Sequence, residues 1–188
     1  MIRSFAAIAL PEAAIEALGR VQRDLPVART VPPENLHVTL VFLGGLDEPS
    51  LEELHLAFSH IHGGPFDLTL DGLGLFGGRK PRLVYAGLAE SAPLRHLQAK
   101  LEQAARLTGI EVERRRFTPH VTLARINDAR VDRDRLERAI AAASAFRAGP
   151  FPVRGFGLFR SDLGRAGAIY SELAHYPLSS STNPASAP

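Results

Sequence analysis

The tetrapeptide His-Val-Thr-Leu occurs twice in this chain, at residues 37–40 and again at residues 120–123, 83 positions later. Composition alone predicts roughly 0.002 copies of it, so a matched pair is not accidental. Side chains on a strand alternate between its two faces. Each copy therefore predicts a strand whose Val and Leu are buried, while its His and Thr lie together on the opposite face.

The segments around the two copies also repeat. The order strand, helix, strand, helix, strand is predicted from residue 4 to 75 and again from 82 to 159. Because the connections vary, we predict an α+β fold of two lobes related by an internal pseudo-twofold, with a central cleft. That symmetry would make both His and both Thr side chains face each other across the cleft. We expect one two-lobed domain over residues 1–178 and a flexible tail at 179–188.

Hydrophobic periodicity and terminal residues place the individual elements. Strands are predicted at residues 4–10, 35–43, 66–75, 82–88, 119–126, 151–159 and 168–176. Helices are predicted at residues 11–25, 49–60, 93–107 and 132–143. Each half thus supplies the elements of one repeat unit, and the strand at 168–176 completes the chain.

Composition excludes several classes of protein. The chain has no Cys, which excludes a disulfide scaffold, a thiolate metal site and a cysteine nucleophile. Of its 22 basic residues all but Lys80 and Lys100 are Arg, whose planar guanidinium suits phosphate. No stretch reaches the ~18 apolar residues of a membrane span. Pro11 and Glu12 interrupt the apolar N-terminus too early for a secretory signal. We therefore expect a cytoplasmic monomer without membrane contact.

Two facing imidazoles suit displacement at phosphorus. The entering oxygen must lose a proton and the leaving oxygen must gain one, on opposite sides of the phosphorus atom. With an ordinary pKa near ~6.5, one His can act as the base and the other as the acid. The hydroxyls of Thr39 and Thr122 would hold the non-bridging oxygens, where negative charge accumulates. This chemistry needs no metal and no cofactor.

Two weaker patterns do not support a metal or a cofactor. His55, His60 and His62 cluster at a predicted helix end, but no matched carboxylate ligands accompany them. Residues 72–77 satisfy the G-x-G-x-x-G dinucleotide pattern, yet another strand follows where a helix is required. We interpret these glycines as a strand end and a turn.

The paired tetrapeptides resemble those of the two-histidine (2H) phosphoesterases. Their surroundings look like the branch of RNA 2′,3′-cyclic phosphodiesterases, also named 2′-5′ RNA ligases. The resemblance covers nearly the whole chain: the opening at 5–11, residues 31–36 and 116–119 before the two tetrapeptides, and 163–178 at the end. It implies a bilobal α+β fold and hydrolysis of an RNA 2′,3′-cyclic phosphate to a 2′-phosphomonoester without metal.

The resemblance also implies residue roles. His37 would be the proton donor and His120 the proton acceptor, although the near-symmetric sequence does not fix which is which. Arg125 matches an arginine of this branch that would reach the phosphate, but strict alternation places it on the face opposite His120. Phe117 follows the basic run 114–116 and would stack on a base, unless that run is only a solvated surface.

Three functions remain open at this stage. The first is hydrolysis of RNA 2′,3′-cyclic phosphate ends, with the RNA terminus as the partner. The second is a phosphodiesterase or ligase that acts on 2′-5′ linkages or on another small cyclic nucleotide. The third is a non-catalytic RNA-end binder that uses the His and Thr side chains only to grip phosphate. Two proton-transfer groups favour catalysis, because binding alone does not need them.

Overall fold

The structure is a computed structural model that describes residues 1–78, 80–113, 116–126, 131–164 and 167–179. Most of the tail predicted at 179–188, and Arg114 and Arg115 of the basic run, lie outside the described residues.

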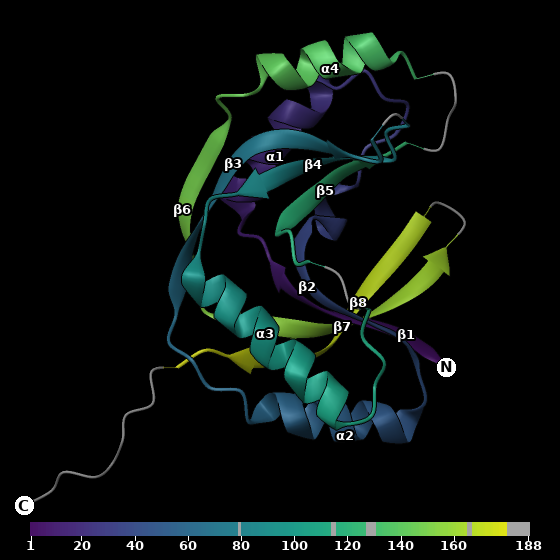
Figure 1. The fold of residues 1–188 in the computed structure, drawn as a ribbon, viewed down its shortest axis with the longest axis vertical. Coiled ribbons are helices and arrows are strands. Elements are labelled where there is room, and N and C mark those ends of the chain that lie inside the picture. The colour runs from purple at the N-terminus through teal and green to yellow at the C-terminus, as the bar shows by residue number, and fades with distance from the viewer. Residues whose placement is uncertain (79, 114–115, 127–130, 165–166, 180–188) are drawn as a thin grey trace, which may run out of the picture.

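Helices and strands alternate along the chain (Figure 1). The α-helices are α1 (Glu12–Asp24), α2 (Glu48–Ser59), α3 (Ala92–Leu107) and α4 (Arg133–Ala142), and a 3-10 turn, η1, covers Pro33–Asn35. The strands are β1 (Ile2–Ala9), β2 (His37–Leu46), β3 (Phe66–Phe76), β4 (Leu83–Leu88), β5 (His120–Arg125), β6 (Arg147–Val153), β7 (Gly155–Gly164) and β8 (Gly167–Pro177). All four predicted helices and six of the seven predicted strands are found in place.

The single strand predicted at 151–159 is wrong. The chain forms two strands there, β6 and β7, which pair with β3 and β1 respectively. The buried positions change phase at the break, from Phe151 and Val153 to Phe156 and Leu158. Gly155 begins β7 where the backbone of β8 comes close, because a Cβ at this residue would lie 2.7 Å from the carbonyl oxygen of Tyr176. The change of phase was visible in the sequence and is the signal that separates the two strands.

One antiparallel sheet of eight strands runs through both lobes, in the order β6-β3-β4-β5-β2-β1-β7-β8. The first four strands of this order form one lobe and the last four form the other, with β5 and β2 at the centre. The lobes do not coincide with the sequence halves 4–75 and 82–159. β3 leaves the first half to pair with β4, and β7 returns to pair with β1.

Two of the helices also cross between the lobes. α1 connects β1 to β2, yet it contacts β5 and β6 of the opposite lobe. α3 connects β4 to β5, yet it contacts β2 and α2. Figure 1 shows the result, with α1 and α4 gathered at one end of the molecule and α2 and α3 at the other. The two lobes are therefore held together by crossing connections as well as by the sheet.

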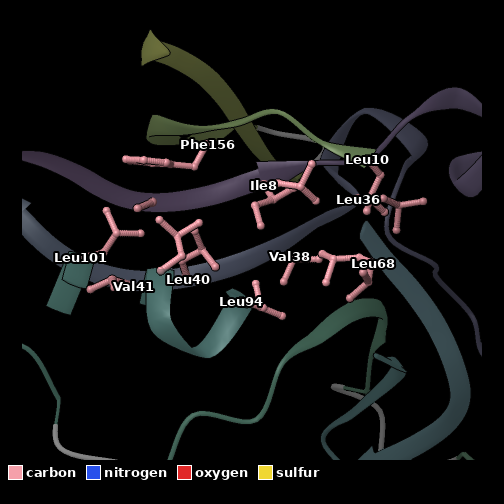
Figure 2. Packing of buried hydrophobic residues seen from close by; sticks show 14 of the residues in the cluster. Ile8, Leu10, Leu36, Val38, Leu40, Val41, Leu68, Leu94, Leu101 and Phe156 are labelled. Atoms are coloured by element: carbon pink, nitrogen blue, oxygen red, sulfur yellow. The ribbon is translucent and has the colours of Figure 1, made fainter. Parts of the chain in front are cut away.

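The central strand pair β2 and β5 is the narrowest part of the sheet. Val38 and Val121 are the one pair of residues in register between these strands, and both side chains are fully buried. Figure 2 shows that Leu94 and Leu101 of α3 pack near Val38 and Leu40 on this apolar face. The apolar side of each His-Val-Thr-Leu strand thus anchors the helices, as the alternation predicts.

A buried glutamine joins β5 to the segment that precedes β2. Gln22 of α1 is 8% exposed, and its Nε2 donates hydrogen bonds of 2.9 Å to the carbonyl oxygens of Val31 and Leu123. The backbone N–H of Val31 donates to the same Leu123 oxygen at 2.7 Å. The segment that leads into β2 is thereby attached to β5 through one amide side chain.

We predict that Gln22→Glu destabilises the protein by about 1–3 kcal/mol, because a carboxylate cannot donate to the two carbonyl oxygens it would face. Urea denaturation at neutral pH measures the change. The matched control is Gln103→Glu at an exposed position of α3, where a change within about 0.5 kcal/mol is expected. Equal stability of the two variants would contradict the assigned role of Gln22.

Candidate functional site

The four motif side chains lie on the same face of the central strand pair. His37 and Thr39 alternate with the buried Val38 in β2, and His120 and Thr122 alternate in the same way in β5. Because Val38 is in register with Val121 and the strands are antiparallel, one step along the ladder places His37 across from Thr122. The same step on the other side places His120 across from Thr39. The arrangement is therefore twofold around the Val38–Val121 pair.

These four side chains line a cleft of about 510 Å³. Its walls carry side chains from both lobes, among them Phe5, Tyr170, Phe76 and Arg82. The predicted central cleft is thus confirmed, and it contains both His and both Thr residues.

The ring of His37 is fixed by two hydrogen bonds. Its Nδ1 donates to the carbonyl oxygen of Asn35 at 2.8 Å, so in the neutral ring Nε2 carries the lone pair. Nε2 lies 3.0 Å from Oγ1 of Thr39, whose hydroxyl donates to it. Asn35 is held in turn, because its Nδ2 donates to the carbonyl oxygen of Ala168 at 2.7 Å. The backbone thus holds the Nδ1 proton, and Nε2 is the atom at which His37 can gain or lose a proton.

His120 has a backbone hydrogen bond that matches the one at His37. Its Nδ1 donates to the carbonyl oxygen of Thr118 at 2.8 Å, two residues earlier, as Asn35 stands two residues before His37. Aromatic rings also flank both imidazoles. The centroids of Phe5 and Tyr170 lie 5.0 and 5.2 Å from His37, and those of Phe76 and Tyr85 lie 5.0 and 5.5 Å from His120. The local supports of the two imidazoles are therefore twofold as well.

Burial lowers the pKa of His37 below its ordinary value of 6.5. The hydrogen bond to the Asn35 carbonyl opposes this effect, while the charges of His120 and Arg125 add to it. A His37 imidazolium therefore gives up its proton more readily than an ordinary one. The influence of His120 and Arg125 also shows that both lie close to His37 in space.

Arg125 lies on the cleft side, so the placement expected from strict alternation is wrong. β4 pairs Val84 with Ala124 but Tyr85 with Thr122, which leaves Leu123 as an extra residue in a β-bulge. Leu123 and Ala124 are both fully buried, and Arg125 returns to the face of His120. The bulge therefore brings the guanidinium into the cleft.

Phe42 is a cleft residue that the sequence analysis missed. β1 pairs Ala6 with Val41 but Ala7 with Thr39, so Leu40 is extra, as Leu123 is in β5. The bulge turns Phe42 into the cleft at 48% exposure, 6.2 Å from the ring of Phe5. Alignment of the two strands as His-Val-Thr-Leu-Val-Phe and His-Val-Thr-Leu-Ala-Arg is the signal that identifies it.

Phe117 and Arg116 line the cleft from the segment that enters β5. Phe117 is half-buried against the core, and its carbonyl oxygen accepts a 3.4 Å hydrogen bond from Arg95. Arg3 and Arg82 also line the cleft. With Arg125, these arginines give the walls a set of donors that suits phosphate groups.

Other histidines in the described ranges serve local contacts. Nδ1 of His55 lies 2.9 Å from the hydroxyl of Tyr176, and Nδ1 of His60 donates to the carbonyl oxygen of Leu56 at 2.8 Å. Within the described part of the chain, no group of three or more His, Cys, Asp or Glu side chains could hold a metal ion. None of the helices described here is long and apolar enough to cross a membrane.

Residues 10–165 match the family model described as the 2′-5′ RNA ligase superfamily. The chain belongs to this superfamily. A Geobacillus stearothermophilus protein named RNA 2′,3′-cyclic phosphodiesterase is 33% identical over 93% of this chain, which spans 56% of that protein's length. A Methanothermobacter thermautotrophicus protein of the same name is 31% identical over 94% of this chain and 99% of its own.

The fold of this superfamily member is also that of solved structures. Crystalline E. coli LigT in complex with 3′-AMP superposes with a TM-score of 0.79 at 27% sequence identity, over 95% of this chain and 99% of that one. The predicted α+β bilobal fold and the predicted family are thus confirmed. The roles given to individual side chains stay predictions.

We predict that NMR titration of the His37 imidazole gives a pKa below 6.5 in the free protein. Tyr170→Ala removes a ring that shields His37 from water, so it should raise this pKa toward 6.5. Tyr170→Phe keeps the ring and is the matched control, with a pKa close to that of the wild type. A wild-type pKa at or above 6.5 would show that burial does not govern this imidazole.

Proposed function

We propose that this protein hydrolyses 2′,3′-cyclic phosphate ends of RNA to 2′-phosphomonoesters by acid and base catalysis. The observation that carries the proposal is the pair of imidazoles in one cleft, His37 and His120, each with Nδ1 bound to a backbone carbonyl. This anchoring leaves proton exchange to the two Nε2 atoms, one from each lobe. A single displacement needs one proton acceptor and one proton donor, and the cleft supplies both.

The proposed reaction begins with attack of water on the phosphorus atom. His120 takes a proton from the attacking water, the P–O3′ bond breaks, and His37 gives a proton to O3′. The product is a 2′-phosphate with a free 3′-hydroxyl, and the two histidines end with their proton states exchanged. Thr39, Thr122 and Arg125 would hold the non-bridging oxygens during the displacement.

The relatives support this substrate class. Proteins from Geobacillus stearothermophilus and Methanothermobacter thermautotrophicus carry the name RNA 2′,3′-cyclic phosphodiesterase, and E. coli LigT was crystallised with 3′-AMP. The arginines that line the cleft add support, because phosphates of an RNA end would meet guanidinium groups there. That the protein acts as a cytoplasmic monomer remains part of the proposal.

A 2′-5′ linkage is the second candidate substrate, and the name of the family model favours it. The same proton transfers would serve that linkage, with a 5′-hydroxyl in place of water. Turnover of a cyclic mononucleotide, a cyclic-ended oligonucleotide and a 2′-5′ dinucleotide separates the candidates. Preference for the dinucleotide would overturn the substrate proposed here.

Product analysis of a short RNA with a 2′,3′-cyclic end, in excess EDTA, tests the proposed activity. We expect the wild type to form the 2′-phosphate, and His37→Ala and His120→Ala each to lower the rate by about 10²–10⁴-fold. Thr39→Val and Thr122→Val should lower it less. The control is His96→Ala, an exposed histidine of α3 outside the cleft, which should keep the wild-type rate. Bound RNA without product would instead indicate an RNA-end binder.

A further inference from the structure

The outer part of the β7–β8 hairpin projects beyond the sheet. β1 pairs with β7 as far as Arg160, and beyond it the described part of β7 pairs with β8 alone. β8 is the edge strand, and Leu163 and Ile169 near the tip are 86% and 57% exposed. Figure 1 shows this hairpin rising away from β1. We call its outer part, residues 161–164 and 167–170, the arm.

The arm meets the segment around His37 at two points, which lie two residues apart on both segments. Nδ2 of Asn35, in η1, donates a hydrogen bond of 2.7 Å to the carbonyl oxygen of Ala168. Two residues further along each segment, the ring centroid of Tyr170 lies 5.2 Å from that of His37, in an edge-on arrangement. The Tyr170 ring also packs on Phe5 of β1, with the centroids 4.9 Å apart. The arm therefore packs against the imidazole, and one side chain fastens its backbone there.

Asn35 contacts the same imidazole directly through its backbone. Its carbonyl oxygen accepts the 2.8 Å hydrogen bond from Nδ1 of His37. One residue thus fixes the orientation of the ring with its carbonyl group and the cover over the ring with its amide side chain. The burial of His37, which lowers its pKa, agrees with such a cover.

The aromatic rings beside His120 are attached in a different way. They come from Tyr85 of β4, which pairs directly with β5, and from Phe76 of β3, which pairs with β4. Sheet hydrogen bonds therefore hold both rings in place. On the His37 side, Phe5 is held by the pairing of β1 with β2, but Tyr170 belongs to the arm. Its position over His37 therefore depends on the Asn35 hydrogen bond and on ring packing.

We propose that Asn35 is a positioning residue: its side chain docks the arm on the cleft, and the docked arm holds His37 in its buried orientation. The role in catalysis rests on the proposed function, whereas the docking does not. Ser161 and Tyr170 of the arm line the cleft, so docking also completes its wall. Without the amide donor, the carbonyl oxygen of Ala168 must turn to water for a partner, and the arm separates from η1.

Spin labels measure the docking directly, because the chain has no Cys and two can be introduced at chosen sites. Leu163→Cys puts one label on the arm, and Arg20→Cys puts the other on an exposed position of α1. Double electron–electron resonance then gives the distribution of distances between the labels. We expect one narrow distribution in the protein that keeps Asn35.

Two variants remove the donor in different ways. Asn35→Leu keeps the size of the side chain and Asn35→Asp keeps its shape, so one remains informative if the other does not fold. Each should broaden the distance distribution by about twofold or more, as expected for local opening. The matched control is Glu34→Gln at an exposed position of η1, which should leave the distribution unchanged. A distribution that neither Asn35 variant alters would overturn the proposal.

NMR titration of His37 distinguishes positioning from a merely structural role. Asn35→Leu should raise the pKa of His37 toward 6.5, as Tyr170→Ala should, because both remove the cover that keeps water from the ring. The charged groups that act on His37, His120 and Arg125, are the same in both variants. If Asn35 acts through the arm, Tyr170→Ala adds less than about half of its own shift in the Asn35→Leu background. Full additivity of the two shifts would contradict the proposal.

Turnover of a cyclic-ended oligonucleotide tests the role in catalysis. Asn35→Leu should lower kcat by about 10- to 100-fold and change KM less, since a displaced catalytic group costs rate more than binding. Glu34→Gln should keep the wild-type kcat. A wild-type kcat in Asn35→Leu with the arm undocked would overturn the positioning role. The label distances and the titration need no turnover, so a wild type that forms no product would refute the proposed function without deciding the docking.

Discussion

The contact between Val38 and Val121 is the constraint on which the rest of the structure depends. It is the one registered residue pair between the central strands, and it places four polar side chains on the cleft face. Both valine side chains are buried in the core, and Figure 2 shows Val38 near Leu94 of α3. Core packing and the proposed chemistry thus use the two faces of one short ladder, and a slip of one residue would turn every motif side chain to the wrong face.

Sequence periodicity predicted most of this arrangement. Alternation within the two tetrapeptides was enough to place His37 and His120 on a common face, because strands have a strict period of two. The same rule failed at Arg125, since a bulge adds one residue and shifts the phase. Such a bulge depends on pairing with β4, which is distant in sequence. The break before Gly155 was missed although the hydrophobic phase changes there, from Phe151 and Val153 to Phe156 and Leu158.

The site combines symmetric chemistry with an asymmetric environment. Each imidazole has its Nδ1 bound to a carbonyl two residues earlier, and each lies between aromatic rings. Such a site binds a phosphodiester equally well in two directions unless something distinguishes its ends. Phe42 and Arg125 are corresponding cleft residues at which the two strands differ, and both are placed by bulges at the motif's last residue.

The crossing of α1 and the departure of β3 bear on how such a fold arises. A half-length chain that ended after β3 would not form a complete lobe. Its third strand, β3, pairs with β4 and β6, which belong to the other half. Two copies of it would need to exchange these strands, and each would contribute one histidine to a shared cleft. In a homodimer of that kind, equivalent positions of the two subunits must carry identical residues. Fusion of the two copies into one chain removes this constraint, so that one copy can carry phenylalanine where the other carries arginine.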